Sequence, residues 1–586
     1  MSKILKHLKP MEWLQMLVIL IFIMLEVWLD LKLPDYMRGI TRLLQTQGSQ
    51  MGEIWTAGGY MILCALGSLA CVVIVSFFTS RTAAALAMRL RDMIFYKVES
   101  FSMEEMTRFS TSSLITRSTN DIMQVQIFFI SGLQMLLKTP ILAVGGIMKI
   151  AGRGSEWTLA TVVTVSILAV LISCIIAAVM PQFRKIQSLI DNLNLTIKES
   201  LTGRHVVRAY NAEDYQEDKF EAANEAFTYA DKTTNRAMSP FMPAMFMATN
   251  FLTLAIYWIG AYLINAAGTA ESLILFSNMV VFSAYAMQIL NAVKFIVKVV
   301  PRYPRAAVSA RRINEVLETE PLIKDGRMTE GKPGIVGEVV FKNVSFRYPG
   351  AAKNVLDGIS FTARQGETVA FIGSTGSGKS TLVNLVPRLF DAVEGQVLVD
   401  GINVKDYKQE ALNNKIGYIP QNAVLFNGTV SSNVTYGDNG KGGYSGDDVR
   451  KAVHIAQGDE FVGKMECGYE AAISQGGTNI SGGQKQRVSI ARAICRSPEI
   501  FIFDDTFSAL DYKTDRVLRS ELKKETTGST SLIVAQCIGT IMDADQIIVL
   551  DEGKIVGTGT HRELLETCRV YKEIAMSQLS EEELAS

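Results

Sequence analysis

Long runs without charge are concentrated in the first 300 residues, and they constrain the fold more than any other feature of the sequence. A membrane-spanning helix needs about 20 mostly apolar residues. Six mostly apolar runs come close to or exceed that length: Trp13–Leu29, Tyr60–Phe78, Ile122–Met148, Trp157–Met180, Met238–Ala270 and Ser272–Val293. Four of them contain no charge, whereas Glu26 interrupts the first run and Lys138 the third. Core helices of a soluble protein explain so many runs poorly. The first run is long and has no small-residue cleavage site, and more spans follow it, so a cleavable signal peptide is a poor fit. The sequence therefore predicts an all-α membrane domain with six spans.

Lysine and arginine near the ends of the runs predict the orientation. Both residues are frequent in the N-terminal segment, in the long loops after the second and fourth runs, and after the sixth run. The short loops Gly152–Glu156 and Gly268–Glu271 are nearly uncharged, and the first outer loop, Pro34–Trp55, balances two arginines with two acids. We expect both termini and both long loops on the cytoplasmic side of the plasma membrane. The long loops have about 40 to 60 residues, too many for plain connections, and are expected to extend the spanning helices into the cytoplasm.

Two features inside the spans leave alternatives open. Glu26 and Asp30 lie four residues apart on one face of the first helix. They would line a cavity, or Glu26 would pair within the bundle while Asp30 lies at the outer interface. The fifth span opens with methionine and phenylalanine side chains, which suit either a promiscuous apolar pocket or ordinary helix packing. These side chains are Met238, Phe241, Met242, Met245, Phe246 and Met247.

Composition excludes several classes of protein. The formal net charge is +0, which does not favour a nucleic-acid binder. The seven cysteines form no CxxC pair, so neither a disulfide framework nor a zinc site is expected. The 27 Phe and 18 Tyr residues supply ample core and exclude disorder.

A second domain begins after a linker. Residues 321–334 contain two prolines and three glycines, which indicates a break between residues 1–320 and residues 335–586. Beyond it, short β-branched runs such as Val339–Phe346 and Thr368–Ile372 alternate with helical patterns. This alternation is typical of an α/β domain.

A phosphate-binding loop follows the second of these strands. Residues 373–380 fit the pattern GxxxxGK[ST] between a strand and a helix. Lys379 is expected to reach the β- and γ-phosphates of ATP, and Ser380 to bind Mg²⁺. The expected loop residues are Gly373, Ser374, Thr375, Gly376, Ser377, Gly378, Lys379, Ser380 and, directly after them, Thr381. Four apolar residues, Ile500–Phe503, then lead into Asp504, which is expected to emerge beside the phosphates and hold the magnesium shell.

Between these two motifs, Ser481-Gly482-Gly483-Gln484 makes a family resemblance plain. The chain resembles an ABC transporter of the exporter type, with six spans fused ahead of one nucleotide-binding domain. The resemblance implies that Tyr348 stacks on adenine and that Gln421 contacts Mg²⁺ and the attacking water. It also implies that Ser481, Gly482, Gly483 and Gln484 form the signature motif, that Asp511 ends the D-loop, and that Thr111–Asp121 and Asn211–Asp218 are coupling helices. In that family the signature motif closes over the ATP of a second nucleotide-binding domain.

Two positions depart from the family pattern. The residue after Asp504 is normally Glu, the general base, but here it is Asp505. The switch histidine is replaced by Gln536. The ATP held by this chain is therefore expected to hydrolyse slowly, while the intact signature motif serves the site of a partner.

The resulting prediction is ATP-driven export of amphipathic small molecules by a heterodimer. The partner would be a homologous half-transporter with the consensus Glu and His, and the pattern resembles the degenerate-site subunit of bacterial multidrug exporters. Alternatives are a lipid or peptide exporter subunit, and an ATP-gated regulatory or channel-like module. The six spans exclude a soluble mechanical ATPase of the same superfamily.

Overall fold

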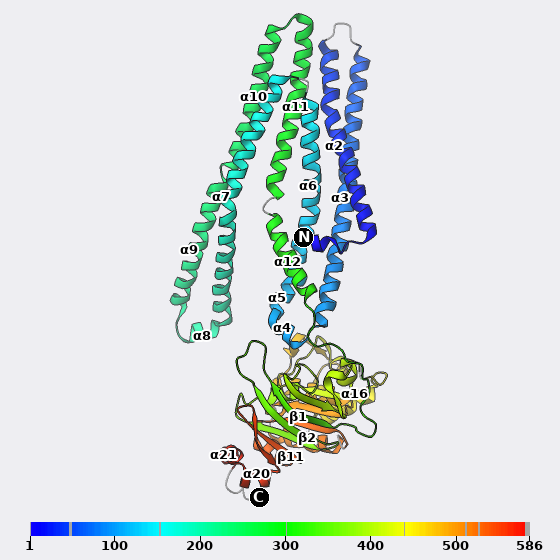
Figure 1. The fold of residues 1–586 in the computed structure, drawn as a ribbon, viewed down its shortest axis with the longest axis vertical. Coiled ribbons are helices and arrows are strands. Elements are labelled where there is room, and N and C mark those ends of the chain that lie inside the picture. The colour runs from blue at the N-terminus through cyan, green and yellow to red at the C-terminus, as the bar shows by residue number, and fades with distance from the viewer. Residues whose placement is uncertain are drawn as a thin grey trace. The chain divides into compact units, whose positions relative to one another are not determined.

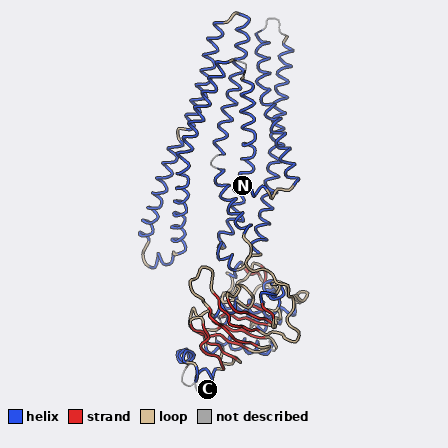
Figure 2. The backbone as a smooth tube through the Cα atoms, viewed as in Figure 1, coloured by secondary structure: helices blue, strands red, loops and turns tan. Residues whose placement is uncertain are grey.

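The computed structural model describes residues 2–45, 50–151, 154–299, 302–438, 440–509, 512–525 and 528–579. The chain forms two compact units. The first contains Met1–Glu99 and Ser112–Thr319, and the second contains Ser100–Thr111 and Glu320–Ser586. Figures 1 and 2 show the first unit as helices and the second as strands with surrounding helices.

The first unit contains six helices that are long and apolar enough to cross a membrane. Their candidate spans lie within Pro10–Leu44, Met51–Glu99, Thr111–Ile150, Ser155–Val179, Glu213–Ala266 and Glu271–Lys294, which agrees with the six predicted runs. The helices of this unit are α1 (Ser2–Leu5), α2 (Pro10–Gln45), α3 (Met51–Glu99), α5 (Thr111–Thr116), the π-helix η1 (Arg117–Asp121), α6 (Ile122–Ile150), α7 (Ser155–Thr202), α8 (Arg204–Ala209), α9 (Glu213–Met238), α10 (Phe241–Ala266), α11 (Thr269–Val299) and α12 (Arg302–Glu318).

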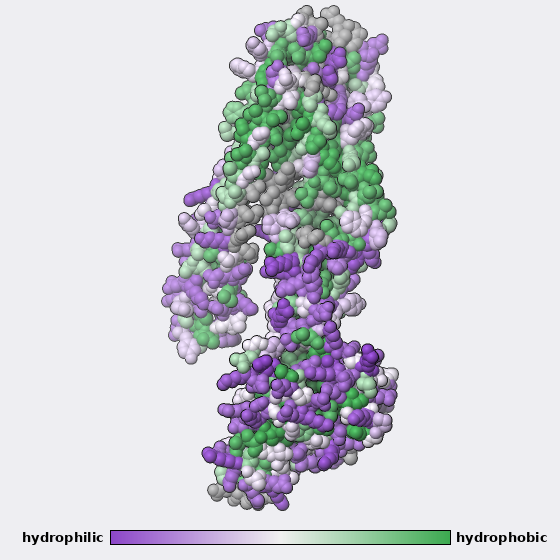
Figure 3. Space-filling model, in the orientation of Figure 1, coloured by the Kyte–Doolittle hydropathy of each residue, from purple (hydrophilic) through white to green (hydrophobic). Residues whose placement is uncertain are grey.

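The long loops are helical, as expected. Helix α3 continues well beyond its apolar run to Glu99, and α7 continues to Thr202 before α8 and α9 return the chain. Helices α7 and α9 lie side by side in Figure 1. Figure 3 shows apolar side chains along the spans, whereas polar side chains dominate around the α8 end of α7 and α9. This separation fits helices that leave a bilayer and continue into water.

Most residues of the segments expected to be coupling helices are helical: Thr111–Asp121 comprises α5 and η1, and Asn211–Asp218 includes the start of α9. Short, separate helices precede them: α4 (Met103–Phe109) and α8. Helix α4 starts at a capping box formed by Ser102 and Glu105. It ends at Phe109, because Ser110 takes a positive φ of 55° that a helix cannot continue through. The capping box of Ser102 and Glu105 thus defines a separate short helix before Thr111–Asp121, and the coupling role of that segment stays a prediction.

Charged side chains inside the bundle pair with one another. Glu26 of α2 is only 3% exposed and contacts the Lys138 ammonium of α6. Asp30 lies 3.5 Å from the same ammonium and accepts a hydrogen bond of 2.6 Å from Ser68 of α3. The structure thus favours pairing within the bundle, and it explains how the run containing Lys138 can be a span.

The second unit is an α/β domain with two larger sheets. Strands β1 (Val339–Phe346), β2 (Leu356–Ala363), β4 (Glu394–Val399) and β5 (Ile402–Asn403) form an antiparallel sheet in the order β2-β1-β4-β5. The other sheet has the order β12-β11-β3-β10-β9-β6, and its strands are β3 (Thr368–Gly373), β6 (Ile416–Ile419), β9 (Ile500–Asp504), β10 (Thr530–Val534), β11 (Gln546–Asp551) and β12 (Lys554–Gly559). Only β12 is antiparallel to its neighbour, and all five residues of β9 are buried.

The remaining elements surround this sheet. They are η2 (Val404–Asp406), α13 (Lys379–Asn384), α14 (Gln409–Asn414), α15 (Val430–Val434), α16 (Gly446–Ile455), α17 (Asp459–Lys464), η3 (Gly468–Glu470), η4 (Gln475–Gly477), α18 (Gly482–Cys495), η5 (Thr506–Ala509), α19 (Tyr512–Glu525), η6 (Ile538–Thr540), α20 (His561–Thr567) and α21 (Arg569–Gln578), with a two-stranded sheet of β7 (Gly428–Thr429) and β8 (Ala472–Ile473). One hydrophobic core fills the space between the two larger sheets, and a second packs helices against the opposite face of the parallel sheet. The parallel strands are buried on both faces, which explains their continuous apolar runs.

Candidate functional site

The predicted site residues converge because four neighbouring parallel strands end at one edge of the sheet. Strand β3 ends at Gly373 and leads into the phosphate loop, while β9 ends at Asp504. Gln421 follows β6, and Gln536 follows β10. In open α/β sheets, ligands bind outside the carboxyl ends of the strands, so this edge is where the topology places a site.

The loop between β3 and α13 has the backbone that a phosphate cradle needs. Gly376 and Gly378 take φ values of +87° and +96°, in the left-handed region that favours glycine. A Cβ at Gly378 would also come within 2.7 Å of the Leu356 side chain. Ser377 is 2% exposed, and its hydroxyl oxygen has no hydrogen-bond partner among the described residues. A buried hydroxyl of this kind suits a loop that closes on an anion.

The ammonium of Lys379 lies over this loop. Its Nζ donates hydrogen bonds of 2.8 Å to the carbonyl oxygens of Gly373 and Ser374. Burial lowers the pKa of Lys379, although the neighbouring carboxylates of Asp505 and Asp504 act in the opposite direction. A phosphate would add negative charge beside this ammonium and favour its protonated form.

Ser380 and Asp504 form a pair of oxygen ligands. The Ser380 hydroxyl donates a hydrogen bond of 2.6 Å to Oδ1 of Asp504. The pKa of Asp504 is raised, mainly by burial and also by the neighbouring Asp505 carboxylate. The hydrogen bond from Ser380 opposes this rise only in part. A hydroxyl and a carboxylate oxygen beside a phosphate loop fit the hard-oxygen preference of Mg²⁺.

Asp505 is the centre of an amide-carboxylate cluster. The residue is 7% exposed, and its φ of 49° turns it sharply away from strand β9. Its Oδ2 accepts hydrogen bonds from Nε2 of Gln536 at 2.6 Å and from Nε2 of Gln421 at 3.0 Å. The three residues predicted to be catalytic are therefore brought into direct contact, and one carboxylate oxygen is shared by two amides.

Tyr348 borders the same cavity and is held by neighbours that sequence reasoning missed. Its hydroxyl lies 3.0 Å from Oγ1 of Thr381. Its ring packs edge-on against Phe346 and Phe390, with centroid distances of 4.9 and 5.3 Å. Phe390 follows α13 in a segment without a motif, and only the fold brings it to Tyr348.

These groups enclose a cavity of about 350 Å³. Its lining residues are Tyr348, Val355, Thr375, Gly376, Gly378, Lys379, Ser380, Thr381, Gln421, Asp505, Val534 and Gln536. An aromatic side chain, a glycine-rich loop with a lysine, and a polar cluster thus surround one space. This arrangement can hold a flat base, an oligophosphate and a divalent cation.

The signature residues do not line this cavity. Ser481 caps the N-terminus of α18, and Gln484 completes the capping box by accepting a hydrogen bond of 2.9 Å from the Ser481 amide. Ser481 and Gly482 are exposed. Asp511 lies outside the described residues. The signature residues thus lie at the start of α18 and outside the cavity that the phosphate loop of the same chain lines.

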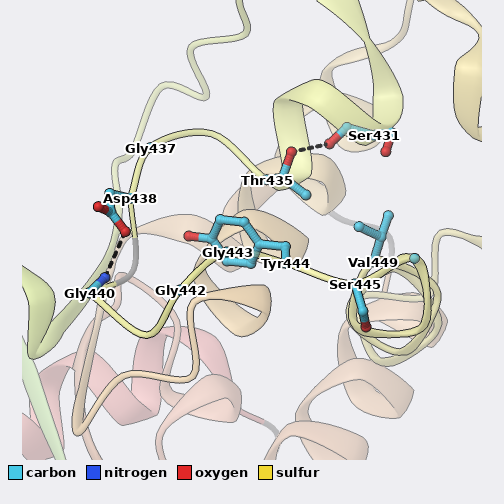
Figure 4. Close-up of a pocket in the computed structure, with 11 residues that line it drawn as sticks. Ser431, Thr435, Gly437, Asp438, Gly440, Gly442, Gly443, Tyr444, Ser445 and Val449 are labelled. Carbon is cyan, nitrogen blue, oxygen red and sulfur yellow. Dashed lines mark hydrogen bonds between the residues drawn. The ribbon is translucent and has the colours of Figure 1, made fainter.

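A more open cavity of about 730 Å³ lies elsewhere in the second unit, between α15 and α16 (Figure 4). Glycines 437, 440, 442, 443 and 446 form much of its lining, together with Thr435, Asp438 and Tyr444. Within it Asp438 accepts a hydrogen bond of 2.9 Å from the Gly440 amide. None of the predicted site residues contributes to this cavity, so it does not compete for the assignment.

Both units match families of known proteins. Residues 356–508 match the ABC transporter family, and residues 16–293 match the ABC transporter transmembrane region. An uncharacterized ABC transporter ATP-binding protein of Mycobacterium tuberculosis is 40% identical over 89% of this chain and 87% of its own length. The uncharacterized ABC transporter ATP-binding protein YfiB of Bacillus subtilis is 33% identical over 99% of both chains.

Two further comparisons concern a more distant relative and a solved structure. An ATP-dependent lipid A-core flippase of Vibrio vulnificus is 29% identical over 86% of this chain and 85% of its own. The structure of a bacterial Atm1-family ABC exporter with ATP bound superposes with a TM-score of 0.80 at 23% identity, covering 97% of this chain and 98% of that one. The fold is therefore that of an ABC exporter. Taken with the full-length relatives, these matches mean that the chain belongs to the ABC transporter family and is a membrane-embedded ATPase and translocase.

Proposed function

We propose that the chain is one half of a heterodimeric exporter of amphipathic small molecules, with its own ATP site hydrolysing slowly. Its termini and nucleotide-binding domain would lie on the cytoplasmic side of the plasma membrane. The observation that carries the proposal is the cluster in which Gln421 and Gln536 both donate to one oxygen of Asp505.

The ATP site would be built from the cavity residues. Tyr348 would stack on the base, and the amides of residues 373–379 with Lys379 would hold the phosphates. Ser380, Asp504 and Gln421 would supply oxygen ligands to Mg²⁺, which neutralises charge on the β- and γ-phosphates when bound. The direct bond between Ser380 and Asp504 already brings two of these oxygens together.

Slow hydrolysis follows from the position of Asp505. Aspartate is one methylene shorter than glutamate, so its carboxylate lies back by about 1.5 Å. A misplacement of about 1 Å can cost roughly 10²-fold in rate. Two amide donors on Oδ2 further hold the carboxylate away from a water, and neutral Gln536 supplies no positive charge to the γ-phosphate.

The exposed N-terminus of α18 supports pairing with a second chain. Ser481 and Gly482 are exposed, and their helix-start amides are suited to a phosphate. In a symmetric pair every site would carry Asp505 and Gln536. A partner with Glu and His at these positions would instead form one competent site under the intact signature motif of this chain.

Steady-state ATP turnover tests the asymmetric assignment. We expect the chain purified alone in lipid to turn over ATP at most at about 1% of the rate of the complex, since a general base contributes roughly 10²–10⁴-fold. Co-purification with the partner should restore turnover, and changing the partner's catalytic Glu to Gln should abolish it again. Brisk turnover by the chain alone would mean that it works as a homodimer with an adequate aspartate base.

The substrate assignment rests on the start of α10, where methionine and phenylalanine side chains are frequent. Some of these side chains lie on a buried face of the helix and others on an exposed face. Met245 is 1% exposed and belongs to the core of the bundle, which is ordinary packing. Met242 and Phe246 are 68% and 71% exposed. The exposed face is the part of the stripe that remains available to an amphipathic molecule.

We expect Met242→Asp to reduce drug-stimulated ATPase of the complex by at least about tenfold, because a carboxylate in an apolar contact costs more than roughly 1.4 kcal/mol. Basal ATPase should stay within about twofold of the original protein. Met242→Leu is the matched control, because it retains an apolar side chain of similar volume. Unchanged stimulation in the aspartate variant would remove this face from the transport pathway.

Lipid is the second candidate substrate, because two relatives that match over 82% and 85% of their own length are ATP-dependent lipid A-core flippases. A lipid would reach the same exposed face of α10 from the bilayer. Reconstituted vesicles distinguish the two functions: drug accumulation without movement of labelled lipid supports drug export, and the reverse supports a flippase.

A further inference from the structure

Tyr348 borders two cavities rather than one. Besides the cavity of the predicted ATP site, it lines a second space of about 270 Å³ within the same compact unit. The second cavity lies between the end of β1, the segment after α13, the linker and the short helix α4. Its lining residues are Ser102, Glu104, Leu322, Ile323, Phe346, Arg347, Tyr348, Pro349, Gly350, Leu389, Phe390, Asp391 and Val393.

One end of α4 is firmly attached to the linker. Glu105 is 2% exposed, and its Oε2 accepts hydrogen bonds from the Ser102 amide at 2.7 Å and hydroxyl at 2.6 Å. Its Oε1 accepts a third from the Leu322 amide at 3.1 Å. The linker is fixed in turn, because Nη1 of Arg388 donates to the carbonyl of Lys324 at 2.9 Å.

The neighbouring acidic residue, Glu104, makes no such contact with the linker. Glu104 is half-buried at the cavity, and its carboxylate has neither a hydrogen bond nor an ion pair among the described residues. Burial and the adjacent Glu105 raise the pKa of this carboxyl. An arginine on the same cavity, Arg347, is exposed and likewise has no such partner in the described parts of the chain. Opposite charges thus share one cavity without a bond between them.

Arg347 directly precedes Tyr348 in the chain, and both side chains line the second cavity. The ring of Tyr348 contacts Phe346 and Phe390, and all three rings line the second cavity. A flat group packed on the Tyr348 ring from the ATP side would restrict this ring cluster, and with it the position of Arg347.

We propose that Arg347 and Glu104 are positioning residues: a base packed on Tyr348 brings the Arg347 guanidinium onto the Glu104 carboxylate and fixes the first turn of α4. The inference rests on the proposed ATP site. Helix α4 lies in the chain between the spanning helix α3 and the α5–α6 segment. Binding of the base at Tyr348 is thereby linked to the segment that joins two spans. This link does not depend on contacts with the γ-phosphate.

Hydrogen exchange of the α4 amides tests this link in the full-length chain with Mg²⁺. ATP should slow their exchange at least about fivefold, the low end of typical allosteric coupling. Inorganic tripolyphosphate, which has no base, should slow it less than about twofold, because a probe that does not contact Tyr348 has no differential interaction with the two arrangements. Glu104→Gln and Arg347→Gln should each lose the ATP effect, and Glu104→Arg combined with Arg347→Glu should recover it. Lys342→Gln, which removes an exposed charge from the same strand β1, is the matched control.

Equal protection of α4 by ATP in the single variants would overturn the inference, and so would equal protection by tripolyphosphate in the original protein. Labelled ATP binding is measured on the same samples. ATP that binds without slowing α4 exchange overturns this inference alone, whereas absence of ATP binding overturns the proposed function itself.

Discussion

Replacing Asp505 by Glu and Gln536 by His in one chain is expected to raise turnover at this site by about 10²- to 10³-fold. The longer side chain moves the carboxylate toward the position of the water, and the imidazole can carry a positive charge beside the γ-phosphate. Asp505→Glu alone is expected to fall well short of this gain, because Gln536 would remain as a neutral amide donor to the new carboxylate. The measurement is ATPase of the complex in which the partner's catalytic Glu is changed to Gln, so that turnover reports this chain's site.

Lys379→Ala in the double variant is the control, and it should return turnover to background. A full-rate Asp505→Glu single variant would show that the length of the acid alone limits the site. No gain in the double variant, with ATP still bound, would contradict the assignment of these two residues as the cause of slow hydrolysis.

Replacing Lys415 by Met is expected to destabilise the nucleotide-binding domain by about 3 kcal/mol, because it leaves a buried charge unpaired. The Lys415 ammonium lies 2.9 Å from both Asp400 and Glu499, and Asp400 is fully buried. The Glu338 amide donates to the other oxygen of Asp400 at 3.1 Å, but an amide does not replace the lost positive charge. A loss of that size should lower the melting temperature of the full-length chain by about 6–12 °C.

The effect of Lys415→Met should vary little between about pH 6 and pH 9. Burial alone would lower the pKa of Lys415, but the hydrogen bonds that its ammonium donates to Asp400 and Glu499 outweigh burial and raise the pKa. A lysine with a raised pKa contributes its full stabilisation below its unfolded pKa of about 10.4 and loses it only above that value. Lys554→Met is the matched control, because Lys554 and Asp357 form an exposed pair of the kind that contributes little. Equal melting temperatures for the two variants would contradict the buried-charge argument.

Much of the fold could be predicted because its signals are local. Strand β1 covers the predicted range Val339–Phe346, and the glycine-rich loop lies between β3 and α13 as its spacing requires. The six spans follow from hydropathy because lipid requires long apolar helices. The short helices α4 and α8 could not be located in this way, because their bounds depend on the capping of Ser102 and on the positive φ of Asn211.

The candidate site could likewise be predicted only in part. The motifs place Lys379, Ser380 and Asp504 directly at or after the ends of strands, and strands of one parallel sheet end at a shared edge, so the proximity of these three residues was predictable. The bonds from Gln421 and Gln536 to one oxygen of Asp505 could not be foreseen, because they depend on side-chain rotamers and on the left-handed backbone of Asp505. Phe390 was missed for a related reason: it contacts Tyr348 across 42 residues of chain with no periodicity to connect them.

The charge cluster of α2, α3 and α6 bears on the insertion of the membrane domain into lipid. A lysine at the centre of a lone helix adds about 2.5–3.5 kcal/mol to its insertion into a bilayer. Lys138 meets its counter-charges on Glu26 and Asp30 of α2, a helix that is synthesised more than 90 residues earlier. Pairing with the first span therefore offsets part of the cost of inserting the third. Loss of both carboxylates would leave that cost with the third span alone.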